Sequence, residues 1–278
     1  MAERISFQGE LGANSHIAAR AAYPGLEPLP CPSFDDAFAA VKEGQARYAM
    51  IPVENSVAGR VADVHHLIPE SGLFIIAERF VPIRHQLLGL KDATLDGLTH
   101  VRSHPQALGQ CRKLLRELGV TAVRTADTAG AAREIAELGD PQIGALASSL
   151  AAEIHGLKVL KADIADAGHN TTRFLVFARD AQRPAPGVDD CMTSLIFRVR
   201  NVPAALFKAL GGFATNGVNM TKLESYIEDG RFEAAMFYAE IEGRPEQQNV
   251  KRALDELAFF SSSLEVMGVY PADLFRRV

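Results

Sequence analysis

Short apolar segments alternate with amphipathic stretches along residues 4–179, and this alternation predicts strands separated by helices. The pattern is typical of an α/β fold, with helices packed on the faces of a sheet. One predicted helix begins after Ser33, which we expect to cap it, with Asp35 and Asp36 in its first turn. The predicted strands are 4–8, 46–53, 73–90 (long enough for two), 99–103, 121–125, 142–147, 159–162 and 173–178.

The periodic pattern stops at residues 180–190, where two prolines, a glycine and charged residues predict an interdomain linker. Beyond it, the pattern predicts a βαββαβ order, which is typical of a small ferredoxin-like sandwich. We therefore expect domains at 1–180 and 191–278, joined by a linker at 181–190. The elements predicted after the linker are strands at 192–200, 219–227, 231–241 and 264–270, a turn at 228–230, and helices at 203–216 and 245–259.

The composition narrows the class of protein. Of the 278 residues, 47% are hydrophobic and 23% charged, which is typical of a globular protein. No apolar run approaches the ~18 residues of a membrane helix and no secretory signal is recognisable, so we expect a cytoplasmic protein. A net charge of −5, no basic stripe and no tryptophan argue against a nucleic-acid partner. The cysteines, Cys31, Cys111 and Cys191, lack metal-ligand spacing, which predicts reduced structural thiols and no metal site.

Two glycines follow the first predicted strand, at Gly9 and Gly12, and a helix is predicted to begin at Asn14 or Ser15. Glycines let the backbone approach a ligand closely, and the N–H groups of a helix start attract a carboxylate or phosphate. The same residues also suit a tight turn with a polar cap. This motif alone therefore does not name a ligand.

A second polar group, Glu54, Asn55 and Ser56, lies at the end of an apolar strand, where open α/β sheets bind ligands. Asn55 and Ser56 could orient a substrate. They are equally ordinary choices for a turn or a helix cap, so both interpretations stand.

The segment from Ser103 to Cys111 also joins a strand end to a helix, with Pro105 suited to the first turn. We expect Ser103 to cap this helix. His104 could titrate near neutral pH, but no partner for a nucleophilic triad is identifiable, which favours a structural histidine. Gln106 is the candidate for a side chain that faces a ligand.

The fourth segment, 168–177, is a polar run that enters an apolar strand. Its hydroxyls, its amide Asn170 and its guanidinium could grip a small acid, since Arg173 can hold a carboxylate in a bidentate manner. A surface loop in which Arg173 makes an ordinary ion pair is the alternative.

Together these segments resemble the prephenate dehydratase family, in the right order and over nearly the whole chain. The most specific match is the Thr-Arg-Phe signature of the family, at Thr172, Arg173 and Phe174. The resemblance implies a catalytic part like a type II periplasmic binding protein, followed by an ACT regulatory domain. Its two lobes would comprise about 1–78 plus 172–180, and about 79–168. The remaining family motifs match Phe7, Gly9, Gly12 and Ser15, then Pro52 and Glu54 to Ser56, and finally Ser103 to Cys111.

The activity that the resemblance implies is the removal of water and carbon dioxide from prephenate to give phenylpyruvate in L-phenylalanine biosynthesis. Such a carbon–oxygen lyase needs no cofactor, because the ring becomes aromatic as both groups leave. Thr172 would donate to the departing hydroxyl and Arg173 would hold a carboxylate, whereas Glu54 could be an acid only if the cleft raises its pKa. The implied substrate contacts are Gly9, Gly12, Ser15, Asn55, Ser56, Ser103, Gln106, Asn170 and Phe174.

Two other functions stay open. An arogenate dehydratase would act on a substrate with an ammonium in place of the side-chain keto group. A non-catalytic amino-acid sensor could also combine a two-lobed binding fold with an ACT domain.

The resemblance further implies feedback by phenylalanine, bound between ACT domains in a homodimer or homotetramer. The usual Gly-Ala-Leu motif is Ala204, Ala205 and Leu206 here, and Glu-Ser-Arg-Pro is replaced by Glu224, Ser225, Tyr226 and Ile227. The added methyl group and the missing arginine lead us to expect weakened inhibition by phenylalanine. Asn201, Asn216 and Asn219 are further candidate contacts for the effector.

Overall fold

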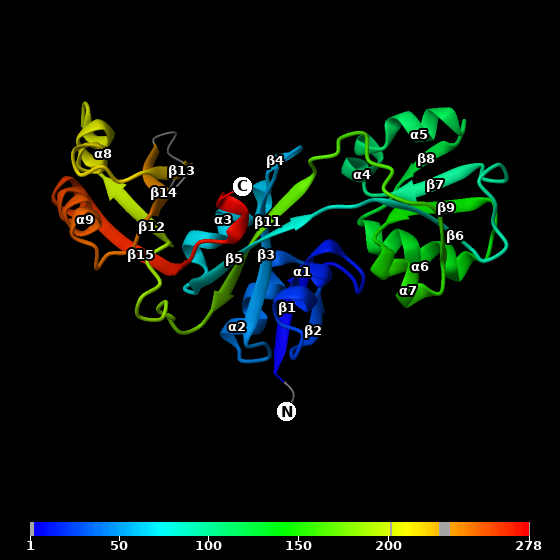
Figure 1. Ribbon diagram of the computed structural model, residues 1–278, viewed down its shortest axis with the longest axis horizontal. Coiled ribbons are helices and arrows are strands. Elements are labelled where there is room, and N and C mark those ends of the chain that lie inside the picture. The colour runs from blue at the N-terminus through cyan, green and yellow to red at the C-terminus, as the bar shows by residue number, and fades with distance from the viewer. Residues whose placement is uncertain (1–2, 201, 228–233, 278) are drawn as a thin grey trace. The chain divides into compact units, whose positions relative to one another are not determined.

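The structure is a computed structural model that describes residues 3–200, 202–227 and 234–277 (Figure 1). It has two compact units: unit one is Met1–Val64 with Arg79–Phe174, and unit two is His65–Glu78 with Leu175–Val278. This grouping does not test the domain boundaries expected from the sequence, which stay predictions.

The first sheet has the strand order β2-β1-β3-β11-β5, with the short β4 paired to β3. Strand β2 was not predicted, because Pro28 and Pro30 break the usual strand pattern. It is tolerated because it pairs only with β1, in parallel, at the edge of the sheet. The elements of this region are β1 (Arg4–Gln8), α1 (Asn14–Ala22), β2 (Glu27–Cys31), α2 (Phe34–Lys42), β3 (Tyr48–Asn55), β4 (Gly59–Arg60), α3 (Ala62–Glu70), β5 (Phe74–Pro82) and β11 (Thr171–Ala178).

Local signals explain where α2 begins. The hydroxyl of Ser33 accepts a hydrogen bond from the backbone N–H of Asp36 at 3.1 Å, as predicted for a cap. Asp35 and Asp36 lie in the first turn, where negative charge favours the helix dipole. One face of α2 buries Ala37, Phe38, Ala40 and Val41.

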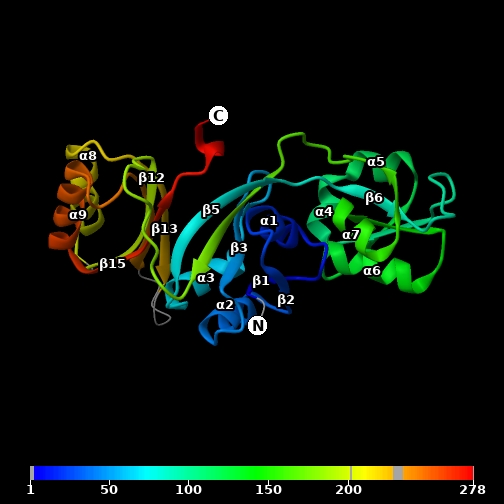
Figure 2. The same ribbon diagram turned by 60° about the horizontal axis from the view of Figure 1, so that its bottom comes forward.

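The second sheet has the order β10-β6-β9-β7-β8 and is covered on both faces. Adjacent residues of one strand point to opposite faces, and Leu87 packs with helices α4 and α5 while Leu88 packs with α6 and α7. Figure 2 shows α6 and α7 beside this sheet. The elements are β6 (Gln86–Gly89), β7 (His100–Ser103), α4 (Pro105–Gln110), α5 (Arg112–Glu117), β8 (Thr121–Arg124), α6 (Thr128–Leu138), β9 (Ile143–Ala147), α7 (Ser149–His155) and β10 (Lys158–Lys161).

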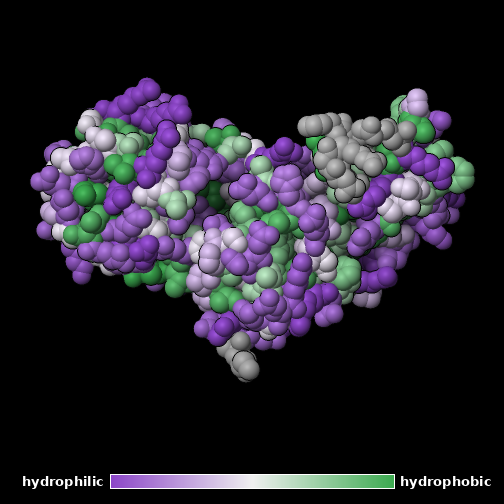
Figure 3. All heavy atoms as spheres, turned by 180° about the vertical axis from the view of Figure 1, so that it is seen from behind, coloured by the Kyte–Doolittle hydropathy of each residue, from purple (hydrophilic) through white to green (hydrophobic). Residues whose placement is uncertain are grey.

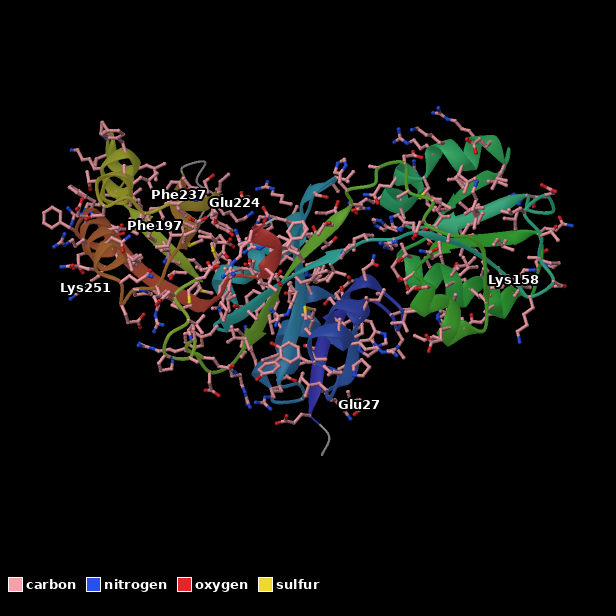
Figure 4. The ribbon with its side chains drawn as sticks, in the orientation of Figure 1. Glu27, Lys158, Phe197, Glu224, Phe237 and Lys251 are labelled. Carbon is pink, nitrogen blue, oxygen red and sulfur yellow. The ribbon has the colours of Figure 1, made fainter. Side chains whose placement is uncertain are left out.

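The third sheet, in unit two, has the order β13-β14-β12-β15 and antiparallel neighbours. The order along the chain is the predicted βαββαβ, although the turn at 228–230 and the strand start at 231–233 lie outside the described residues. The rings of Phe197 and Phe237 stack with centroids 5.3 Å apart, in the core beneath the two helices (Figure 4). The elements are β12 (Cys191–Val199), α8 (Ala205–Thr215), β13 (Met220–Ile227), β14 (Ala234–Glu242), α9 (Gln248–Phe260), β15 (Ser261–Pro271) and the 3-10 helix Leu274–Arg277.

The other face of this third sheet carries a buried ionic network. The fully buried carboxylate of Glu78 accepts from Arg276 Nε at 2.6 Å and from its Nη2 at 2.9 Å. The same guanidinium lies 3.5 Å from the buried Glu240, which also accepts from the hydroxyl of Tyr238 at 2.7 Å. Two buried carboxylates therefore share the Arg276 guanidinium, and its removal takes a cation away from both.

The remaining observations concern the surface of the chain and its cysteines. Among the residues that the structure describes, no helix is long and apolar enough to cross a membrane. Polar side chains cover most of the face seen in Figure 3, with apolar ones in smaller patches. The three cysteines are buried and free, and burial raises the pKa of Cys111 to about 12.

Substitution of Arg276 by methionine should lower the free energy of unfolding by about 3–5 kcal/mol, because it removes a cation that two buried carboxylates share. Arg277→Met is the matched control, since Arg277 pairs with Asp190 where both side chains are largely exposed. The control should cost less than about 1 kcal/mol. Urea unfolding of both variants measures the difference, and equal losses would contradict a special role of Arg276.

Candidate active site

Strands β3 and β11 bring two of the predicted motifs together. Ser56, just after β3, donates its backbone N–H to Thr171 O at 2.9 Å. Its hydroxyl accepts from Thr171 N at 2.9 Å and donates to His169 O at 2.5 Å. These reciprocal bonds fix the polar run before β11 against the end of β3. The predicted participation of Ser56 in a substrate contact stays a prediction.

Asn55 is the centre of the site. Its Oδ1 accepts from the backbone N–H groups of Val57 at 3.0 Å and Ala58 at 2.9 Å, so the side chain does form a turn. Its Nδ2 donates to Asn170 Oδ1 at 2.7 Å and to Thr172 Oγ1 at 2.9 Å. The turn and the polar cluster are therefore built by the same amide.

The direction of these bonds matters for Thr172. A hydroxyl can accept and donate at the same time. Since Thr172 Oγ1 accepts from Asn55, its own hydrogen is free to point to another acceptor. Both Thr172 and Asn170 are buried, whereas Asn55 is half-buried, so the bond to Thr172 is partly shielded from water.

The cluster extends to two residues that sequence reasoning missed, Gln110 and His85. Asn170 Nδ2 donates to Gln110 Oε1 at 2.9 Å, and His85 Nε2 lies 2.8 Å from the same oxygen. Gln110 stands in the matched segment 103–111, so the motif itself was a signal. His85 lies inside the predicted strand segment 73–90, where no pattern singled it out. Burial lowers the pKa of His85, although the bond to Gln110 acts in the opposite direction.

Arg173 is a buried residue and not the surface arginine of the alternative interpretation. Its Nη1 donates to Glu54 Oε2 at 3.2 Å, and its guanidinium carbon lies 5.8 Å from the ring centroid of Phe80. Glu54 therefore acts as an acceptor for the arginine. Phe174 is fully buried in β11, and its predicted contact with substrate stays a prediction.

The glycine loop uses several N–H groups that were expected to bind an anion. Gly9 N donates to Cys31 O at 2.9 Å, and Gly12 N donates to His16 Nδ1 at 3.0 Å. Both glycines have positive φ, at 107° and 95°. A Cβ on Gly12 would lie 2.7 Å from Ala151 Cα, so glycine is needed there for close packing.

Neighbouring residues of this loop have structural partners as well. Glu10 accepts two hydrogen bonds from Arg133, at 2.8 and 3.0 Å, and these lower the pKa of Glu10. The helix begins at Asn14, as predicted, but Ala13 is its cap and forms no side-chain cap bond. Ser15 is buried in the first turn of α1.

The expectation that Ser103 caps α4 was wrong. Its hydroxyl donates to Leu146 O at 2.7 Å, across two strands of the second sheet, and is fully buried. The cap is His104, whose Nδ1 accepts from Gln106 N at 3.3 Å. His104 is one residue closer to the helix than Ser103 and has a ring nitrogen that can accept, so it forms the cap. The Gln106 side chain is exposed, and the network reaches Gln110 one turn later.

The candidate effector residues lie around α8 and β13. Ala204 precedes α8 with φ of 61°, a left-handed conformation that glycine adopts more easily, and Ala205 begins the helix. Leu206 packs against the core of unit two. At the other end of α8, Asn216 Nδ2 donates to Glu256 Oε1 at 3.0 Å, while Asn219 is exposed.

On β13, Glu224 accepts from Lys222 Nζ at 3.3 Å, and Ser225 beside it is exposed (Figure 4). Asn201 lies outside the described residues. Within the described part of the chain, no group of three His, Cys, Asp or Glu side chains is arranged to hold a metal ion.

These features define a mixed α/β protein with a partly buried polar cluster of a hydroxyl, three amides and an imidazole, and with a buried arginine in the strand that carries the hydroxyl. The family model for prephenate dehydratase matches residues 5–182. The chain belongs to the prephenate dehydratase family.

Three relatives illustrate the likeness. A bifunctional N-acyl-homoserine lactone acylase/prephenate dehydratase of Komagataeibacter europaeus is 51% identical over 98% of this chain and 97% of its own. Arogenate dehydratase 2 of Petunia hybrida is 39% identical over 97% of this chain and 72% of its own. The crystal structure of prephenate dehydratase from Arthrobacter aurescens in complex with L-Phe has a TM-score of 0.88 and 28% identity, over 97% and 90% of the two chains.

The histidine beside the glycine loop leads to a prediction on pH. Burial, together with the charge of Arg20, lowers the pKa of His16, whose Nδ1 accepts the N–H of Gly12. Below about pH 6.5 the unfolded state takes up a proton that the folded state resists. The free energy of unfolding should therefore fall as pH is lowered from about 7 to about 5, and His16→Asn should make this slope shallower. Urea unfolding across that range measures it, and equal slopes for both proteins would contradict the assignment.

Proposed function

We propose that this protein catalyses the decarboxylating dehydration of prephenate to phenylpyruvate. The hydrogen bond from Asn55 Nδ2 to Thr172 Oγ1 carries the proposal, because it leaves the threonine hydrogen free to donate. A donor at this position is what the departing ring hydroxyl needs. Membership of the prephenate dehydratase family supports the same conclusion.

The reaction needs little covalent help from the protein. The bond to the ring carboxylate breaks as carbon dioxide leaves, and its electron pair enters the ring while the C–O bond breaks at the opposite position. Negative charge then develops on the departing oxygen, where the Thr172 hydrogen bond would stabilise it. Threonine is a poor acid, so it acts by positioning and hydrogen bonding, and the departing oxygen takes its final proton from water.

Arg173 is the proposed carboxylate partner. Its place in the Thr-Arg-Phe signature supports this role, and its Nη1 donates to Glu54 Oε2. Glu54 is better suited to holding Arg173 than to acting as an acid, since it already acts as acceptor in an ion pair. Arg173 is buried, as are its neighbours Thr172 and Phe174 in β11.

Arogenate is the alternative substrate, and several relatives are named for it. The two acids differ in a side-chain ammonium or keto group. A comparison of kcat/KM for prephenate and arogenate on the purified protein decides between them.

Thr172→Ala should lower kcat by on the order of a hundredfold or more, because a positioned donor at the developing charge is lost. Thr172→Ser, which keeps the hydroxyl, is the matched control and should retain much of the activity. Steady-state kinetics with prephenate, alongside thermal unfolding, make the measurement. Near-normal turnover by the alanine variant would remove Thr172 from the mechanism.

A second activity is suggested by the name of the Komagataeibacter relative, which includes an N-acyl-homoserine lactone acylase. The level of identity, 51%, is the observation that favours it. Assay of amide hydrolysis on an acyl-homoserine lactone, with the wild type and with Thr172→Ala, tests this activity. Loss of dehydration without loss of hydrolysis would assign the two activities to different groups.

We also propose that the βαββαβ part of unit two is an ACT domain that binds phenylalanine, in a homodimer or homotetramer. Its strand order supports this, as does the crystal structure of the Arthrobacter relative in complex with L-Phe. The left-handed φ of Ala204 lies where the family usually has glycine. An L-residue pays roughly 1–2 kcal/mol for this conformation, and its methyl group limits the approach of a ligand.

Ala204→Gly should strengthen inhibition by phenylalanine, lowering the half-inhibitory concentration by roughly threefold to tenfold, within the range of allosteric couplings. Ala205→Gly is the control, because that residue has a helical conformation and no strain to relieve. Prephenate turnover across a phenylalanine series, with calorimetric binding to the full chain, provides the test. An unchanged inhibition curve would show that Ala204 does not weaken the response.

A further inference from the structure

His85 is a buried imidazole that the proposed reaction does not use. It lies between β5 and β6 with only 4% of its surface exposed, and its backbone O accepts from Ile164 N at 2.9 Å. Its Nε2 lies 2.8 Å from Gln110 Oε1, at the end of the polar cluster opposite to Thr172. The inference below rests on the proposed dehydratase function.

The donor and acceptor roles along the cluster follow from its two ends. At one end, the backbone N–H groups of Val57 and Ala58 hold Asn55 Oδ1, so Asn55 Nδ2 must face Asn170 and Thr172. Asn170 therefore presents Oδ1 to Asn55 and Nδ2 to Gln110. This turns the oxygen of Gln110 towards the cluster.

At the other end, the same oxygen of Gln110 faces His85. A carbonyl oxygen cannot donate, so a hydrogen bond at this distance requires the hydrogen to be on His85 Nε2. His85 then fixes Gln110 in the orientation that Asn170 needs. Both neutral imidazole with hydrogen on Nε2 and the imidazolium ion fulfil this requirement.

We propose that His85 is a positioning residue for dehydration, which acts through Gln110, Asn170 and Asn55 to hold the Thr172 hydroxyl as a donor. Without His85, the amide of Gln110 can turn by half a rotation and bring its NH₂ group against that of Asn170. Two donors would then face each other beside the buried Asn170. The amide of Asn170 avoids this contact between donors only by turning as well. Asn55 then loses its acceptor on Asn170, and its hold on Thr172 loosens.

The first test compares two substitutions of similar length. His85→Gln keeps an N–H that can reach Gln110, whereas His85→Met fills the space without a donor. His85→Met should lower kcat for prephenate by roughly tenfold to a hundredfold and change KM by less than about threefold. His85→Gln should recover most of that loss. Equal kcat values for the wild type and His85→Met, or equal losses in both variants, would overturn the proposal.

The second test asks whether the effect passes through Asn55. His85→Met is combined with Asn55→Ala, which already cuts the connection to Thr172. If His85 acts through this chain, it should cause little further loss in that background, so the two effects should be strongly non-additive. Full additivity would indicate a general structural effect and would overturn the proposal.

The third test does not depend on activity or on a variant that might misfold. Nitrogen NMR of the imidazoles in the wild type should show hydrogen on Nε2 of His85. A neutral ring with hydrogen on Nδ1 alone would reverse the direction of the bond and refute the proposal. A wild type that turns over neither prephenate nor arogenate would instead refute the proposed function, and the inference with it.

Discussion

The candidate site depends on the hydrogen bonds of the Asn55 side-chain amide. Its oxygen closes the turn after β3, and its nitrogen reaches the start of β11. Because a primary amide has distinct donor and acceptor ends, fixing one end against the backbone fixes the other. The turn thereby sets the direction of hydrogen bonds among Asn170, Gln110 and Thr172. A polar cluster of this kind is stable only if each polar group in it has a partner. The orientation of each amide therefore depends on the orientation of the others.

One arginine in each unit pairs with carboxylates, in a different arrangement. Arg173, in unit one, pairs with the carboxylate of Glu54 and lies near the ring of Phe80. Arg276, in unit two, lies between the carboxylates of Glu78 and Glu240 and satisfies charges of the protein itself. In both units, removal of one member of such a pair leaves a buried charge with less compensation, so each pair constrains the elements that carry it.

A glycine in a motif that suggests ligand binding can be required for close packing alone. Gly12 was interpreted as part of an anion site, yet its N–H is bound to His16 and its Cα packs against Ala151. The same conformational freedom serves both uses, so the residue type cannot distinguish them. Ala204 presents the reverse case, since an L-residue there adopts a conformation that glycine adopts without strain.

The sequence by itself determined the elements whose signals are local. Apolar periodicity located most strands and helices, and Ser33 and Pro105 marked helix starts that the structure confirms. The βαββαβ order and the motifs at Asn55 and Thr172 could also be recognised in the sequence. Tertiary structure decided what depends on partners far apart in the chain. The prolines of β2 are tolerated only at a sheet edge, Ser103 bonds to Leu146 and not to its own helix, and His85 reaches Gln110 across 25 positions. Hydrogen-bond direction in a buried cluster depends on all its members at once, which is why no single segment of sequence could reveal it.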